Sequence, residues 1–157
     1  MNRKMDRAKI IAPPPLLGVA CIALAFLARH YKPLPLFSSG GPLQIGLGVG
    51  LCVIAAIIIF IARRQMVAQG THPNPYRPTQ SIVVTSVYRF SRNPIYIAFL
   101  LVVLAFAFFA NSLWFIVTDG LLFCLLHFGV VKREENYLAQ KFGDAYREYC
   151  CQVRRWI

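Results

Sequence analysis

The sequence predicts an all-α integral membrane protein with four transmembrane helices, cytoplasmic N and C termini and an amphipathic C-terminal helix. Hydrophobic residues make up 57% of the chain and charged residues 15%, whereas soluble domains carry about 25% charged residues. The apolar residues form long runs, as in helices that cross a bilayer. We expect a single domain of 157 residues, with spans at about 10–28, 43–62, 94–110 and 113–131.

The lysines and arginines predict how these spans are oriented. Of 17 such residues, 15 fall in the N-terminal tail, the loop at 63–93 and the tail at 132–157, and two fall in the loop between the first two spans. Because positive charge is retained in the cytoplasm, we expect both tails and the loop at 63–93 to be cytoplasmic, in a bacterial inner membrane. Topology and anionic membrane lipids then explain the net charge of +11, and no nucleic-acid partner is expected.

The first two spans carry signals of helix start and helix packing. The proline triplet at 13–15 suits the first turn of the first helix, where missing N–H groups cost little. Gly46 and Gly50 have the spacing that lets helices pack closely in lipid. No strand precedes these glycines, so we reject a dinucleotide-binding loop. The arginine pair at 63–64 is expected to end the second helix.

The third and fourth spans are expected to form an antiparallel hairpin around a turn at 111–112. Asn93 suits the capping position of the third helix and Pro94 its first position. Beyond the fourth span, apolar residues three or four apart predict one face of an amphipathic helix, broken at Gly143, with Asp144 capping the next turn. This face could lie on the membrane or fold back over the long loop. Its residues are Leu138, Phe142, Tyr146, Tyr149 and Val153.

Side chains capable of chemistry gather at the cytoplasmic ends of this hairpin. The segment Arg92–Tyr96 is expected to face Glu134 and Glu135 across a short gap. His127, seven residues before Glu134, lies on nearly the same face of a continuous helix. Such a set of groups suits a ligand that is partly charged and partly apolar. Each group also has a simpler interpretation, as a topology charge, a helix cap or a solvated helix end.

Two further features give no site of their own. Asp119 lies near the middle of the fourth span, where a lone charge costs several kcal/mol, and we expect it to contact the second or third span. The five cysteines show no C-x-x-C pair and no His/Cys metal spacing. We therefore expect reduced thiols and no metal site.

Two ordered motifs resemble the signature of the isoprenylcysteine carboxyl methyltransferase and phospholipid methyltransferase family of integral membrane enzymes. The resemblance extends over residues 71–157. The first motif reads Thr85-Ser86-x-Tyr88-x-x-x-Arg92-Asn93-Pro94-x-Tyr96. The second reads Glu134-Glu135-x-x-Leu138, then Phe142-Gly143-x-x-Tyr146-x-x-Tyr149, then Val153-Arg154-Arg155-Trp156.

The resemblance implies a methyltransferase that uses S-adenosylmethionine at the cytoplasmic face and acts on a lipid or prenylated substrate. It implies catalytic roles for Arg92 at the substrate headgroup and for Glu135 or His127 as proton acceptor from an amine. The implied cofactor-binding residues are Gln80, Ser81, Ile82, Val83, Tyr88, Asn93, Pro94, Ile95, Tyr96 and Glu134.

The sequence departs from the family pattern at two positions. Asn93 stands where a histidine is common. Val130 stands where carboxyl methyltransferases place an arginine that orients the substrate, and Lys132, Arg133 or His127 could take its place. The methylated nucleophile therefore stays open among oxygen, nitrogen and sulfur.

Other classes of membrane protein fit the hydropathy pattern less well. An NADPH-dependent reductase related to sterol reductases usually needs more than four spans. A non-catalytic four-helix adaptor leaves the paired motifs unexplained. A small multidrug transporter is disfavoured because the first span has no acidic residue.

Overall fold

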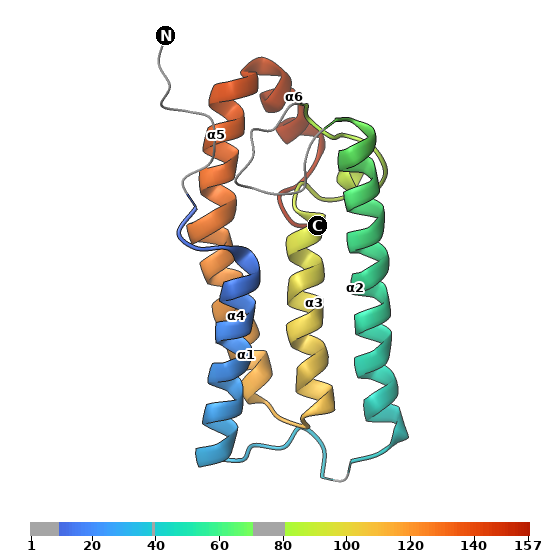
Figure 1. The fold of residues 1–157 in the computed structure, drawn as a ribbon, viewed down its shortest axis with the longest axis vertical. Helices are drawn as coiled ribbons and strands as arrows, with labels where there is room; N and C mark the ends of the chain where they lie inside the picture. Colours follow the sequence, from blue (N-terminus) through green and yellow to red (C-terminus); the bar gives the residue numbers. More distant parts are fainter. Residues whose placement is uncertain (1–9, 39, 71–80) are drawn as a thin grey trace.

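The computed structural model describes residues 10–38, 40–70 and 81–157, and within these ranges every regular element is a helix. The described residues form a bundle of long helices that run up and down, side by side (Figure 1). The elements are α1 (Pro14–Tyr31), α2 (Pro42–Ala68), the 3-10 turn η1 (Ser86–Arg89), α3 (Pro94–Phe109), α4 (Trp114–Leu126), the π-helical turn η2 (His127–Val131), α5 (Lys132–Phe142) and α6 (Asp144–Gln152).

The bundle is built from two helix pairs. Helix α3 packs most extensively on α2, and α1 packs on α4, while α3 also contacts α1 and α4. The end of α2, the start of α3 and helices α5 and α6 lie at one end of the bundle (Figure 1). The α1–α2 connection and the α3–α4 turn lie at the other end. This is the same-side arrangement that the charge pattern predicts, and which membrane face it occupies stays a prediction.

Three helices are long and apolar enough to cross a membrane, and α3 is the fourth, shorter apolar helix. Two of the three are α1 and α2, and the third is the continuous helix at 114–142 that joins α4, η2 and α5. Helix α3 has 16 residues, which at 1.5 Å per residue make about 24 Å. The predicted all-helical fold is confirmed for the described residues, with three or four helices long and apolar enough to span a membrane.

The helix boundaries follow the prediction at the start of α1 and α3 and differ at the end of α2. Pro14 opens α1 and Pro94 opens α3, each at a first-turn position. Helix α2 continues through the arginine pair at 63–64 to Ala68. The expected stop was wrong because basic side chains are exposed there and do not interrupt helical hydrogen bonding.

The glycines of α2 pack differently from the prediction. Gly46 and Gly50 face open space, whereas a Cβ at Gly48 would come within 2.5 Å of the Phe109 ring of α3. The close approach of α2 and α3 therefore occurs at Gly48. Nearby, the buried side chain of Gln44 donates a hydrogen bond to the carbonyl oxygen of Phe108, which joins the two helices again.

The hairpin turn between α3 and α4 is tied to the α1–α2 connection. Asn111 adopts a positive φ of 46°. Its Oδ1 accepts hydrogen bonds from the backbone N–H groups of Leu36 and Phe37 at 3.1 and 2.9 Å. Its Nδ2 donates to the carbonyl oxygen of Phe37 at 3.0 Å. The Asn111 side chain thus provides hydrogen-bond partners for backbone groups of the α1–α2 connection.

The amphipathic C-terminal helix breaks where expected and folds back over the long loop. Gly143 has a φ of +56° between α5 and α6, a left-handed conformation that glycine adopts without strain. Asp144 does not cap α6; its carboxylate pairs with Arg147 at 3.0 Å. The apolar face of α6 packs on Ile82 of the loop. Of the two arrangements that the sequence left open, the structure has the second.

Asp119 of α4 lies near α1. It is close enough to Cys21 of α1 to interact with it electrostatically. Its Oδ1 is buried and has no hydrogen-bond partner among the described residues. Helix α4 packs on both α1 and α3, and the expected contact of Asp119 with the second or third span stays a prediction.

Replacing Gly48 by leucine should separate α2 from α3. Overpacking a tight contact costs about 1–3 kcal/mol, so the variant should unfold at a lower temperature than the wild type. The matched control is Gly46→Leu, on the open face of the same helix, which should change stability little. Thermal unfolding in detergent measures both, and equal melting temperatures for the two variants would contradict the assigned contact.

Candidate functional site

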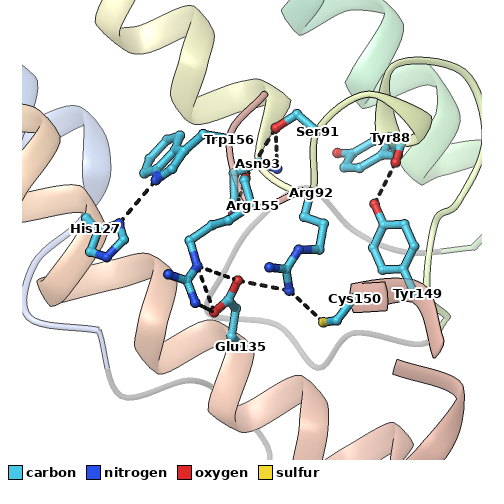
Figure 2. Close-up of polar contacts among 10 residues, drawn as sticks. All are labelled: Tyr88, Ser91, Arg92, Asn93, His127, Glu135, Tyr149, Cys150, Arg155 and Trp156. Atoms are coloured by element: carbon cyan, nitrogen blue, oxygen red, sulfur yellow. Dashed lines mark hydrogen bonds and ion pairs between the residues drawn. The ribbon is translucent and has the colours of Figure 1, made fainter. Parts of the chain in front are cut away.

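Two guanidinium groups hold the carboxylate of Glu135 at the end of the bundle where α3 begins (Figure 2). Arg92 Nη1 lies 3.1 Å from Glu135 Oε1. Arg155 makes a forked contact, with Nη2 at 2.7 Å from Oε2 and Nε at 2.9 and 3.0 Å from the two oxygens. The side chains of Arg92 and Glu135 are only 11% and 14% exposed. Charge-assisted contacts of this kind are stronger than neutral hydrogen bonds.

The last five residues of the sequence lie alongside the entry to α3. The backbone N–H of Arg92 donates to the carbonyl oxygen of Arg154 at 3.1 Å. The carbonyl oxygen of Arg155 accepts hydrogen bonds from Asn93 Nδ2 at 2.9 Å and Ser91 Oγ at 3.4 Å. Both peptide groups that flank Arg155 are therefore fixed to the segment 91–93.

These contacts correct the predicted role of Asn93. It occupies the capping position of α3, but its side chain makes no capping hydrogen bond. Its amide is used on the carbonyl oxygen of Arg155 instead. The first turn of α3 keeps the benefit of Pro94, whose missing N–H needs no partner.

Glu134 is paired with Tyr96, as the predicted hairpin requires. The Tyr96 hydroxyl donates to Glu134 Oε1 at 2.8 Å. Glu134 lies in the first turn of α5, beyond the apolar residues that end at Val131. The pKa of Glu134 is raised to about 7: burial is the main cause, the hydrogen bond from Tyr96 opposes the rise, and the neighbouring Glu135 adds to it. The carboxyl group thus changes charge near neutral pH.

His127 lies beside Trp156 rather than beside Glu134. The indole Nε1 of Trp156 donates to His127 Nδ1 at 3.1 Å, and the two rings stack with Phe123. The predicted shared face with Glu134 was wrong because residues 127–131 form a π-helical turn. Such a turn has i→i+5 hydrogen bonds and shifts the register of the residues that follow.

The predicted cofactor segment forms a wall across the end of α2. Ser81 Oγ donates to the carbonyl oxygen of Gln69 at 2.7 Å. Val83 and Tyr88 are buried with Ala62 of α2, and Ile95 packs against them. Ile82 packs on α6, and Pro94 is buried at the start of α3. Gln80 lies outside the described residues.

Tyr149 of α6 binds the backbone of the predicted cofactor segment at Tyr88. Its hydroxyl donates to the carbonyl oxygen of Tyr88 at 2.7 Å, and both tyrosines are buried (Figure 2). Burial raises the pKa of Tyr149 above its ordinary value, so the hydroxyl keeps its proton and stays a donor.

Val130, which stands where carboxyl methyltransferases have an arginine, faces the interior of the bundle. Val130 is fully buried and packs with Cys21, Val103 and Leu122. Lys132 and Arg133 are exposed, and the Lys132 ammonium lies over the Phe128 ring at 4.7 Å. The guanidinium beside the acidic pair comes instead from Arg155. Sequence reasoning counted Arg155 in a motif but gave it no role, because spacing does not reveal that the chain turns back after α6.

Arg92 has one donor to spare. Its Nη1 contacts Glu135 and the thiol sulfur of Cys150. Its Nε is buried and has no hydrogen-bond partner among the described residues. A buried N–H without a partner is costly, which makes Arg92 Nε a candidate donor to an anionic or carbonyl oxygen of a ligand.

Comparison with known proteins gives one family match and one similar sequence. Residues 43–145 match the family model described as phospholipid methyltransferase. An uncharacterized protein of Haemophilus influenzae is 40% identical over 63 residues, which cover 40% of this chain and 98% of that protein. No solved structure gives a significant match.

Tyr149→Phe should destabilise the fold by about 1–3 kcal/mol, because the buried carbonyl oxygen of Tyr88 loses its partner. The expected observation is a lower melting temperature in detergent. Tyr31→Phe is the control, since the Tyr31 side chain is exposed at the end of α1. A Tyr149→Phe variant as stable as this control would show that the hydrogen bond contributes nothing.

Proposed function

Because the chain belongs to the phospholipid methyltransferase family, we propose that it is an S-adenosylmethionine-dependent methyltransferase that modifies a lipid headgroup at the cytoplasmic face of a bacterial inner membrane. The observation that carries the proposal is the pairing of both glutamates with the entry to α3. Glu134 accepts a hydrogen bond from Tyr96, and Glu135 is held by Arg92. These contacts lie where the apolar helices end, which is where a lipid presents its headgroup.

The groups at this site fit the chemistry of the cofactor. S-adenosylmethionine carries an ammonium group and a carboxylate, and when bound it supplies an electrophilic methyl group. The carboxylate of Glu134 is suited to hold a cation. The unpartnered Nε of Arg92 is suited to hold an anionic oxygen. The wall from Ser81 to Val83, with Tyr88 and residues 93–96, is the proposed boundary of the cofactor site.

In the proposal, the protein aligns the methyl donor with the nucleophile and excludes water from the site. A methyl transfer is an in-line displacement, so its rate depends on alignment of donor and nucleophile in a dry site. Hydrogen bonds to the carbonyl oxygens of Arg154 and Arg155 attach the C-terminal segment to the start of α3, beside the acidic pair. In the proposal Arg92 holds the anionic part of a ligand, with Glu135 keeping its guanidinium in place.

A phospholipid amine is the favoured acceptor. The arginine that orients a carboxylate substrate is absent, and Val130 in its place is buried. An amine must lose a proton before it attacks. The two expected acceptors are engaged, Glu135 by two guanidinium groups and His127 by Trp156. Glu134, whose pKa is raised to about 7, is therefore a third candidate for this role.

The direct test is methyl transfer to lipid. Purified protein is incubated with methyl-labelled S-adenosylmethionine and vesicles that contain either phosphatidylethanolamine or a prenylated cysteine analogue in a phosphatidylcholine background. The proposal predicts label in the phosphatidylethanolamine product. Label in the prenylated analogue alone would move the acceptor to a carboxylate, and no label in any lipid would overturn the proposal.

Glu134→Gln should weaken S-adenosylmethionine binding about 10- to 100-fold if the carboxylate holds the cofactor's ammonium group, since hydrogen bonds to charged groups are worth about 1.5–3 kcal/mol. Calorimetric titration without lipid measures this affinity. Glu148→Gln, on the exposed face of α6, is the charge-matched control. Unchanged cofactor affinity with slower methyl transfer would assign Glu134 to the substrate amine instead.

Cofactor affinity should also rise with pH through about 7. The pKa of Glu134 is raised, so the carboxyl is protonated below this value and cannot hold a cation, whereas above it the carboxylate can. Tyr96→Phe removes the hydrogen bond that opposes the rise, so the midpoint should move to higher pH. Titrations between pH 6 and 8 measure the midpoint, and a flat profile in the wild type would contradict the role of Glu134.

A further inference from the structure

Arg155 and Arg92 share the single carboxylate of Glu135 unequally. Arg155 takes the forked contact, reaching both carboxylate oxygens through Nε and Nη2. Arg92 makes a one-point contact through Nη1. This division leaves Arg92 Nε without a partner among the described residues, although it is buried. Arg92 thus has an unpartnered donor beside a carboxylate whose forked contact is made by Arg155.

The main chain around Arg155 is fixed on both sides. The carbonyl oxygen of Arg154 accepts a hydrogen bond from the Arg92 backbone, and that of Arg155 accepts from the side chains of Ser91 and Asn93. One residue further, the Trp156 indole is bonded to His127. Figure 2 shows Arg155 and Arg92 reaching Glu135 from different sides, with Trp156 next to His127. The orientation of the Arg155 side chain is thus set by contacts independent of Glu135.

We propose that Arg155 is a positioning residue of this site: it occupies Glu135 so that Arg92 keeps a free donor for an anionic oxygen of the ligand. Without Arg155, the Arg92 guanidinium can turn to bind both Glu135 oxygens through Nε and Nη2, which is the forked arrangement that Arg155 now has. The Nε donor of Arg92 would then be used within the protein and lost to the ligand. This inference rests on the proposed function.

The anionic oxygen has two possible sources with the same chemistry. One is the carboxylate of S-adenosylmethionine, and the other is the phosphate of the lipid headgroup. A guanidinium binds both by charge-assisted hydrogen bonds. Loss of cofactor affinity identifies the first source, and a raised KM for lipid at saturating cofactor identifies the second.

The experiment compares Arg155→Ala and Arg155→Lys with Arg154→Ala. Arg154 is the matched control, because its side chain is exposed and its removal deletes the same charge one residue away. For each protein we measure the Kd for S-adenosylmethionine, and kcat and KM for phosphatidylethanolamine in vesicles. Circular dichroism and elution volume in detergent verify the fold.

Arg155→Ala should weaken one of the two ligand constants about 10- to 100-fold, because a hydrogen bond to a charged group is worth about 1.5–3 kcal/mol. Arg155→Lys should fall between this variant and the wild type, since lysine keeps the charge but cannot fork. Arg154→Ala should stay within about threefold of the wild type. In a Glu135→Gln background, Arg155→Ala should add little, because both residues act through one contact.

Some outcomes would overturn the inference. They are wild-type constants in folded Arg155→Ala, or equal losses in Arg155→Ala and Arg154→Ala. If Arg155→Ala does not fold, Arg155→Lys decides: a loss of threefold or more in one ligand constant supports the inference, and wild-type constants overturn it. A wild-type protein that neither binds the cofactor nor methylates lipid overturns the proposed function itself, which is a different result.

Discussion

The constraint on which the end of the bundle around α5 and α6 depends is the carboxylate of Glu135. A partly buried charge at the edge of the apolar helices is costly unless oppositely charged groups surround it. Its partners, Arg92 and Arg155, come from chain segments that are more than 60 residues apart. Satisfying one carboxylate therefore brings together the start of α3, the start of α5 and the end of the chain.

The same convergence depends on the sharp reversal at Gly143. The positive φ of this residue lets α6 turn back over the loop, where Tyr149 reaches the backbone of Tyr88. Val153 then packs with Tyr146 and Tyr149, which directs the following residues toward α3. The turn at Gly143 thus brings α6 onto the loop, and the packing of α6 in turn places Arg155.

The sequence predicted the features that depend on local pattern. Apolar runs gave the helices, and two motifs placed Arg92 and Tyr96 opposite the acidic pair, because a short turn at 111–112 forces antiparallel packing. Two errors at the site share a physical cause. The predictions that Asn93 caps α3 and that His127 lies beside Glu134 both assumed that contacts are made between neighbours along a regular helix. The C-terminal segment supplies the actual partners of Asn93 and His127, and the π-helical turn changes the direction of the residues that follow it. The spacing of residues in the sequence reveals neither feature.

The shortness of α3 affects the lipid beside it. Its 16 residues give about 24 Å of helix, whereas a bilayer has an apolar core of about 30 Å. The difference is about 6 Å, and a bilayer meets such a mismatch by thinning locally or by drawing polar groups inward. In the proposed membrane arrangement, the polar entry of α3 would lie below the average headgroup plane. A lipid next to α3 would need only a small displacement along the membrane normal to bring its headgroup to Arg92, while its acyl chains stay in the bilayer.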